Sequence, residues 1–288
     1  MIPISRFLKE IVEALKLEHT IFALPFAYLG LWVAAGGDPS WAVVGWVTLA
    51  MVGARTAGMS LNRLIDLPLD RLNPRTRNWP VPAGRVSVPQ LLSIAAVAAA
   101  IFFFCASRLN PLCLRLSPWV LVIMAIYPTL KRLTWACHFG LGLVLAGAPV
   151  GGWLAVTGYW EPTVLPLAAG VFFWVAGFDI LYALLDLDFD RAYGVYSIPQ
   201  HFGLQRALAT STLCHALAIL SFIWFGWITG QGRWFWIGCA LVAAFIIYEH
   251  KLVSPGRLDR VNRAFFTVNG WVSVSLFLFT LLDLKMSR

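Results

Sequence analysis

The chain alternates long apolar runs with short polar segments. The runs cover residues 20–36, 41–62, 88–106, 118–130, 134–156, 163–186, 207–228, 234–249 and 264–283. A helix needs roughly 20 apolar residues to cross the hydrocarbon core of a bilayer. The run 118–130 is short, so we expect a tilted helix or a locally thinned bilayer there. The pattern predicts an all-α, multi-pass membrane protein with about nine transmembrane helices.

Turn residues separate the runs, and composition supports the same fold class. The breaks are Gly36-Gly37-Asp38-Pro39, Asn110-Pro111, Tyr127-Pro128, Gly158 to Pro162, Gly230 to Gly232 and Ser254-Pro255-Gly256. Of the 288 residues, 59% are apolar and 12% are charged, whereas a soluble domain carries about a quarter charged residues. The net charge of +8 comes from short basic clusters with no continuous stripe. We therefore expect a lipid bilayer as partner, no nucleic acid and no obligate protein partner.

The basic clusters also predict orientation. With nine spans, sixteen of the 22 Lys and Arg residues fall on the side of the N-terminus and five on the other side, and Arg55 lies inside the second run. Basic residues concentrate in cytoplasmic loops. We expect a protein of the cell (inner) membrane whose N-terminus and polar site loops face the cytoplasm.

Two acidic motifs close the second and sixth runs. They read Asn62-x3-Asp66-x3-Asp70 and Tyr182-x3-Asp186-x3-Asp190. Residues four apart share one helix face, whereas Asp188 points elsewhere. Arg55 and Asp179 each stand seven residues before their motif, which places them deeper in the membrane on the same face. We infer one domain, 1–288, made of two related bundles (about 1–133 and 134–288) whose acidic faces meet across a central cavity.

The residue types in these motifs indicate magnesium and phosphate. Closely spaced carboxylates repel one another unless a cation joins them, and a few oxygen ligands suit Mg²⁺ that shares its shell with water and substrate phosphate. Intramembrane ionisable groups are costly and usually functional. Arg75 in the loop 71–85 and the pair Lys131-Arg132 can hold phosphate oxygens. The sequence predicts a site for a diphosphate whose organic tail lies in lipid.

The chain resembles the UbiA superfamily of intramembrane prenyltransferases. The matching stretches are RTAGMSLNRLIDLPLDRLNPRTRNWPVPAG (55–84), YPTLKR (127–132), FDILYALLDLDFDRAYGVYSIPQHFG (178–203), LEHTIFALPFAYLG (17–30), YEHKLV (248–253) and AFFTVNGWVSVSLF (264–277). The resemblance implies nine helices around a central cavity and Mg²⁺-dependent transfer of a prenyl chain from its diphosphate to an aromatic acceptor.

Site roles follow from the resemblance by position. Asn62, Asp66 and Asp70 would bind one Mg²⁺ and Asp186 and Asp190 the other, while Arg75 and Lys131 would hold the diphosphate. Asp179 and Arg55 would lie near the acceptor or support the metal shell, with Tyr182 also binding substrate. Three positions depart from the family pattern: Arg63 follows Asn62 where Asp is common, Trp79 replaces an arginine, and Leu185 replaces a frequent glutamine. These departures bear on the identity of the acceptor more than on the type of reaction.

Two further points stay open at this stage. The expected acceptor is 4-hydroxybenzoate in quinone biosynthesis; the alternatives are a precursor of the futalosine route to menaquinone or, in another class, a cation-coupled secondary transporter. The five histidines share no metal-ligand spacing and are interpreted as packing or interface residues, with His201 the nearest to an acidic motif.

The orientation can be tested by labelling. Single cysteines placed in the loops 71–85 and 190–206 should react with a membrane-impermeant thiol reagent only from the cytoplasmic side. The reason is that sixteen basic residues fall on the side of these loops, and basic residues keep loops in the cytoplasm. Reaction of either loop from outside intact cells would reverse the predicted topology.

Overall fold

The computed structural model describes residues 4–15, 20–253 and 268–286, and these residues form helices without strands. In chain order the elements are α1 (Ile4–Leu15), α2 (Thr20–Ala34), α3 (Trp41–Asp70), α4 (Val88–Leu109), α5 (Pro111–Ile126), η2 (Tyr127–Arg132), α6 (Cys137–Thr157), η3 (Pro162–Val164), α7 (Leu165–Ala183), η4 (Leu184–Asp186), α8 (Leu187–Tyr193), α9 (Ile198–Ile228), α10 (Arg233–Leu252) and α12 (Asn269–Met286). The predicted all-α fold is confirmed. Lys16, the turn Ser254-Pro255-Gly256, Arg257, Arg260, Arg263, Arg288 and the start of the ninth run (264–267) lie outside the described residues.

Seven of the described helices are long and apolar enough to cross a membrane. The shorter apolar helix α2 and the helix α12 correspond to the first and ninth predicted runs. The expected number of about nine transmembrane helices therefore holds approximately. The grouping into two related bundles stays a prediction.

The fourth run was predicted too short. The structure has a helical segment from Pro111 to Arg132, which is 22 residues long and needs neither strong tilt nor thinning. The helix begins at Pro111 because Asn110 caps it, its Oδ1 accepting from the Cys113 backbone N–H at 2.9 Å. Asn110 also donates to the Leu154 carbonyl of α6 at 2.8 Å. The polar residues Arg115 and Ser117 lie inside this helix, and they made the apolar run appear to begin only at residue 118.

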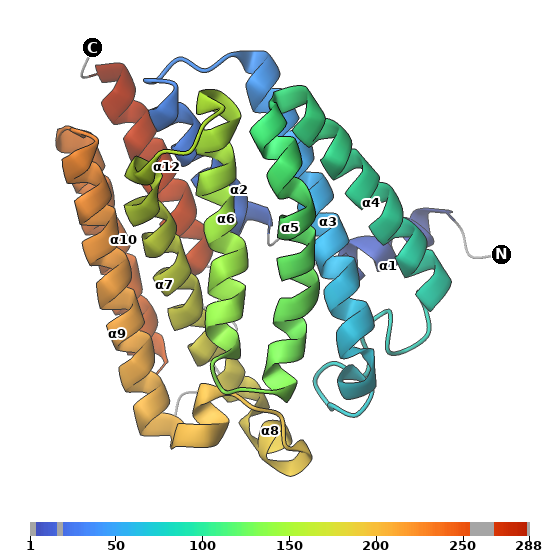
Figure 1. Cartoon of the computed structure of the whole chain (residues 1–288). Coiled ribbons are helices and arrows are strands. Elements are labelled where there is room, and N and C mark those ends of the chain that lie inside the picture. Colours follow the sequence, from blue (N-terminus) through green and yellow to red (C-terminus); the bar gives the residue numbers. More distant parts are fainter. Residues whose placement is uncertain (1–3, 16–19, 254–267, 287–288) are drawn as a thin grey trace.

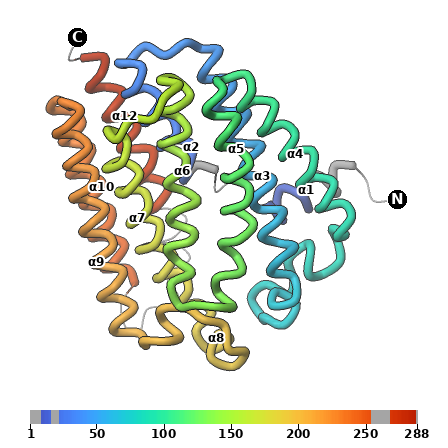
Figure 2. Tube along the Cα trace, viewed as in Figure 1, coloured from blue at the N-terminus to red at the C-terminus, as the bar shows by residue number. Residues whose placement is uncertain are grey.

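The long helices stand side by side and bring the polar connections to one end (Figure 1). The main packed pairs are α3 with α4, α2 with α6, α6 with α7, α7 with α9, and α10 with α12. The tube in Figure 2 shows residues 71–87, the α5–α6 connection and α8 together at the lower end. Helix α1 packs against α3 at an angle to the bundle.

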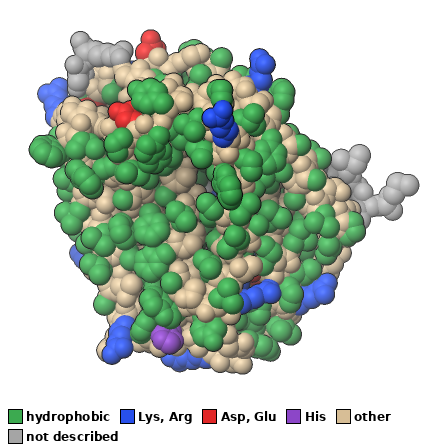
Figure 3. All heavy atoms as spheres, viewed as in Figure 1, with side chains coloured by type: hydrophobic (Ala, Val, Ile, Leu, Met, Phe, Trp, Pro, Cys, Tyr) green, Lys and Arg blue, Asp and Glu red, His purple; other side chains and the backbone are tan. Residues whose placement is uncertain are grey.

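The helices meet through large aromatic side chains and small residues. Trp174, Phe26 and Phe222 are almost fully buried in the largest core cluster. Where α2 crosses α6, a Cβ on Gly152 would lie 2.0 Å from the Ala27 carbonyl oxygen, so only glycine allows this approach. The outside is apolar as well: Figure 3 shows hydrophobic side chains over most of the visible face, as expected for a surface in lipid.

Candidate active site

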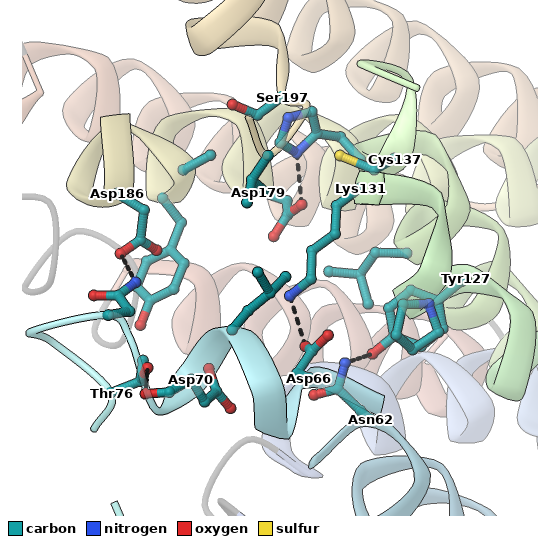
Figure 4. A pocket seen from close by; sticks show the side chains of 18 of the residues that line it. Asn62, Asp66, Asp70, Thr76, Tyr127, Lys131, Cys137, Asp179, Asp186 and Ser197 are labelled. Carbon is teal, nitrogen blue, oxygen red and sulfur yellow. Dashed lines mark hydrogen bonds and ion pairs between the residues drawn. The ribbon is translucent and has the colours of Figure 1, made fainter. Parts of the chain in front are cut away.

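A cavity of ≈ 680 Å³ lies at the end of the bundle where the polar connections meet. Its walls come from the end of α3, the loop after it, η2, the start of α6, the end of α7, and α8 with the segment that follows. All residues predicted for the site line it: Arg55, Asn62, Asp66, Asp70, Arg75, Lys131, Asp179, Tyr182, Asp186 and Asp190. Figure 4 shows Asp66 and Asp70 facing the same space as Asp179 and Asp186.

The first acidic motif lies on one face of α3, as its spacing predicts. The helix runs without interruption to Asp70. Asp66 and Asp70 are 6% and 8% exposed, so their carboxylates sit largely out of bulk water. Lys131 reaches from η2 and pairs with Asp66 Oδ2 at 2.7 Å (Figure 4). Asn62 donates to the Tyr127 hydroxyl at 3.2 Å, which joins the motif to η2 a second time.

The second acidic motif does not lie on one continuous α-helix, contrary to the prediction. Helix α7 ends at Ala183, a 3₁₀ turn covers Leu184–Asp186, and α8 begins at Leu187. The break still brings both carboxylates into the cavity. Asp186 accepts from Asn73 Nδ2 at 2.8 Å, and Asp190 accepts from the Ser197 hydroxyl at 2.9 Å. Asp188 is exposed and does not line the cavity, as expected.

Arg75, in the loop that follows the first motif, contacts the second motif. Its Nε donates to Asp186 Oδ1 at 2.8 Å, Nη2 pairs with Asp186 Oδ2, and Nη1 donates to the Tyr182 hydroxyl at 2.9 Å. Burial alone would lower the pKa of Arg75, but the hydrogen bonds to Asp186 and the neighbouring Tyr182 raise its pKa above the ordinary value. Arg75 is therefore a permanent cation that lines the cavity beside the second motif.

Two departures from the family pattern, Arg63 and Trp79, contact each other. The Arg63 guanidinium lies 4.3 Å from the centroid of the Trp79 ring. Its Nη1 is 3.8 Å from Asp70 Oδ2, and its Nε donates to the Ala14 carbonyl of α1 at 3.0 Å. The two substitutions thus form one unit, which places a buried cation beside Asp70 and fixes α1 to the site.

Asp179 has a partner that sequence reasoning missed. His138 Nδ1 lies 2.7 Å from Asp179 Oδ2, and His138 Nε2 accepts from the Ile198 backbone N–H at 3.2 Å. Because Nε2 accepts, Nδ1 carries the proton that His138 donates to Asp179. His138 was interpreted as a packing residue, and that was wrong. No local spacing links residues 41 positions apart, so the sequence held no signal for the pair.

His201 stands outside the cavity. It is exposed and stacks on Trp135, with ring centroids 6.4 Å apart. Two basic residues near the motifs in sequence do not line the cavity. Arg132 is exposed and donates to the Ile65 carbonyl, and Arg85 pairs with Glu10 of α1 at 2.8 Å. Closeness in sequence to an acidic motif therefore does not by itself place a residue in the cavity, as His201, Arg132 and Arg85 show.

The donor atoms fit a cation that shares its shell with a substrate. Asp66 Oδ1 and Asp70 Oδ2 are buried and have no hydrogen-bond partner. Among the described residues, no three His, Cys, Asp or Glu side chains converge into a ready cage. Mg²⁺ usually takes one or two protein carboxylates and completes its shell with water and phosphate, so this open arrangement suits it better than a dedicated cage would.

Comparison with known proteins places the chain and its fold in one family. Residues 23–272 match the model of the UbiA prenyltransferase family. This chain belongs to the UbiA prenyltransferase family. It is 32% identical to the 4-hydroxybenzoate octaprenyltransferase of Alkalilimnicola ehrlichii over 258 residues, which is 89% of this chain and 87% of that protein. The resemblance noted from the sequence is confirmed.

Solved UbiA structures share the architecture. The apo structure of a UbiA homolog from Aeropyrum pernix K1 has a TM-score of 0.84 at 38% identity, covering 92% of this chain and 98% of that one. A UbiA homolog from Archaeoglobus fulgidus, bound to GPP and Mg²⁺, has a TM-score of 0.68 at 18% identity and covers 96% of this chain and 99% of that one. The chain is a membrane prenyltransferase, and this decides against the cation-coupled transporter.

The Arg63–Trp79 unit predicts energetic coupling. In a double-mutant cycle of Arg63→Leu and Trp79→Leu, the free energies of unfolding in detergent should be non-additive by about 1 kcal/mol, the size of a partly desolvated cation–π contact. Arg77→Leu with Trp79→Leu is the matched control, since Arg77 is exposed. Additive losses in the Arg63 cycle would argue against the unit.

Proposed function

We propose that this UbiA family member transfers a polyprenyl group from polyprenyl diphosphate to an aromatic acceptor, 4-hydroxybenzoate, in quinone biosynthesis. The observation that carries the proposal is a pair of acidic clusters facing one cavity, each held by a basic side chain from another segment. Lys131 pairs with Asp66 at 2.7 Å, and Arg75 pairs with Asp186. The name of the Alkalilimnicola relative supports this acceptor.

We assign the metal ligands by cluster. Asn62, Asp66 and Asp70 would hold one Mg²⁺, and Asp186 and Asp190 a second. Asp66 Oδ1 and Asp70 Oδ2 are buried and accept no hydrogen bond, and this supports the assignment, as do the GPP and Mg²⁺ bound to the Archaeoglobus homolog. When bound, Mg²⁺ supplies positive charge that stabilises the departing diphosphate. Both carboxylate clusters would then face the same substrate.

The protein's own cations would change partners when the diphosphate binds. Lys131 and Arg75 each neutralise a carboxylate within the described structure. Once metal takes over that role, both side chains can turn to phosphate oxygens, and charge-assisted contacts of this kind are strong where water is excluded. Tyr182, already bonded to Arg75 Nη1 at 2.9 Å, would keep the guanidinium oriented.

Transfer breaks the allylic C–O bond and forms a C–C bond to the acceptor ring. The bonding electrons leave with the diphosphate, a ring carbon attacks the allylic cation, and the ring then loses a proton to a base. Asp179 would accept a hydrogen bond from the acceptor hydroxyl and so make the ring more nucleophilic. His138 holds Asp179 in place through the 2.7 Å contact. Arg55, which also lines the cavity, would contribute charge beside the acceptor.

The site should face the cytoplasm of a cell (inner) membrane. The loop 71–87, η2 and α8, which carry Arg75, Lys131 and Asp190 respectively, lie at one end of the bundle (Figure 1). That end carries the larger share of basic residues in the sequence count. A cytoplasmic opening gives the enzyme access to a water-soluble aromatic acid, while the prenyl donor enters from lipid.

The acceptor can be identified directly. Membranes that contain the protein, supplied with a labelled prenyl diphosphate, Mg²⁺ and a panel of aromatic acids, should form a prenylated 4-hydroxybenzoate detectable by mass spectrometry. If product forms only from a precursor of the futalosine route, the proposed acceptor is wrong but the proposed prenyl transfer is correct. No prenylated product from any acceptor would contradict the proposal.

The two-cluster assignment predicts that neither cluster can replace the other. Asp66→Asn and Asp186→Asn keep side-chain size but remove the charge that holds a cation, so each should lower transfer by at least roughly a hundredfold. The double variant should be about as inactive as either single one, because the groups act as a unit. Wild-type activity should vanish with chelator and return with Mg²⁺.

Asp188→Asn is the control for these variants. The side chain is exposed outside the cavity, so most activity should remain. Amounts of protein extracted from membranes and thermal unfolding in detergent should match wild type for every variant. An Asp188 variant as inactive as Asp186→Asn, or a chelator-resistant wild type, would sink the two-metal assignment.

A further inference from the structure

Arg63 is a buried cation on the face of α3 that carries the first acidic motif. It stands three residues before Asp66 and seven before Asp70, so the three side chains share one helix face, and all three line the active-site cavity. The Arg63 side chain is 9% exposed, and arginine keeps its charge even when it is buried. Its Nη1 lies 3.8 Å from Asp70 Oδ2. The first acidic cluster therefore contains a permanent positive charge of its own.

Contacts from two other segments hold this charge in place. The guanidinium lies 4.3 Å from the centroid of the Trp79 ring, which belongs to the loop after α3. Its Nε donates to the Ala14 carbonyl at 3.0 Å. Ala14 is in the last turn of α1, where a carbonyl has no partner within its own helix. If Arg63 turned away, this buried carbonyl would lose its donor, so Arg63 is fixed beside Asp70.

Lys131, the other cation of the first cluster, is held far less firmly. Its Nζ pairs with Asp66 Oδ2 at 2.7 Å, and its side chain is 29% exposed. A lysine ammonium sits on a flexible four-carbon stem and can exchange one oxygen partner for another. Lys131 can therefore leave Asp66 when another cation arrives, whereas Arg63 stays.

The carboxylate oxygens that would receive a metal ion lie close to the fixed charge. Asp66 Oδ1 and Asp70 Oδ2 are buried and accept no hydrogen bond, and Figure 4 shows both side chains facing the cavity. Asp70 Oδ2 is also the atom that lies 3.8 Å from Arg63 Nη1. A divalent cation on this oxygen would meet a like charge at short range, and such repulsion is strong where water is largely excluded. The two carboxylates attract the metal ion, and Arg63 opposes it.

We infer that Arg63 is a fixed counter-charge that lowers the affinity of the first acidic cluster for a free divalent cation. The inference rests on the proposed function, because it concerns the Mg²⁺ ligands proposed there. Arg63 offers no lone pair to a metal ion. It is a positioning residue, which acts on the metal through the charge it places beside Asp70. The first cluster thus binds metal less tightly than its two aspartates alone would allow.

Binding of Mn²⁺ in the absence of any prenyl substrate tests this inference. The full-length protein in detergent is titrated with Mn²⁺, and the free ion is followed by electron paramagnetic resonance. Arg63→Gln should raise the affinity for Mn²⁺ by roughly tenfold or more, because it removes the repelling charge and keeps a donor for the Ala14 carbonyl. The gain should vanish when Asp66→Asn is added. A merely structural role for Arg63 would give the opposite sign, since damage to the cluster weakens metal binding.

Three further variants separate the fixed charge from other effects. Arg63→Lys keeps a cation and should bind Mn²⁺ much as wild type does. Arg77→Gln removes one positive charge from an exposed residue of the neighbouring loop that does not line the cavity, so it should leave the affinity unchanged. Trp79→Leu removes the ring that holds Arg63 and should raise the affinity by a smaller factor than Arg63→Gln does.

The outcomes distinguish this inference from the proposed function. Equal or weaker Asp66-dependent binding of Mn²⁺ in Arg63→Gln, or the same gain in Arg77→Gln, would overturn the inference while the wild type still transfers prenyl groups. If Arg63→Gln does not fold, unchanged binding in Trp79→Leu would overturn it in the same way. Failure of the wild type to prenylate any acceptor would instead contradict the proposed function, whatever the affinities for Mn²⁺.

Discussion

A carboxylate at the edge of a bilayer must have its charge compensated, and this requirement organises the polar half of the structure. Asp66 pairs with Lys131, Asp186 with Arg75 and Asp70 with Arg63, while Asp179 accepts a hydrogen bond from His138. In every case but one the partner comes from a different secondary-structure element; Arg63 and Asp70 share α3. Leaving a buried charge unpaired costs several kcal/mol. The pairs therefore hold the loop after α3, η2 and α6 against the acidic helix ends.

Packing differs across the molecule in a way that suits this polar end. Helix α7, which carries Asp179, is the most buried span, and its Trp174 donates to Asn269 of α12 at 3.0 Å. Asn269 in turn donates to Glu249 of α10 at 2.8 Å. The α5–η2 segment, which carries Lys131, has few buried residues. One wall of the active-site cavity is thus backed by buried side chains and hydrogen bonds between helices, whereas the wall formed by α5 and η2 is far less buried.

Local periodicity was sufficient for some features and insufficient for others. The four-residue spacing of Asn62, Asp66 and Asp70 predicted a shared face correctly, because α3 continues through the motif. The same spacing around Asp186 predicted a continuous helix, but a 3₁₀ turn intervenes, and neither glycine nor proline in Leu184–Asp186 marks it. The start of α5 depends on the Asn110 cap, which was read only as a break. The Arg63–Trp79 and His138–Asp179 contacts are tertiary, so composition and spacing carried no trace of them.

The partners of the carboxylates also fall in a definite order along the chain. Both cations that compensate the first motif, Arg63 and Lys131, precede residue 133, so the first part of the polypeptide can neutralise Asp66 and Asp70 by itself. Asp186 depends on Arg75, which is 111 positions earlier in the sequence. During synthesis from the N-terminus, Asp186 therefore emerges from the ribosome after its counter-charge has been synthesised. Translation order therefore makes the cations that pair with Asp66, Asp70 and Asp186 available no later than the second motif itself.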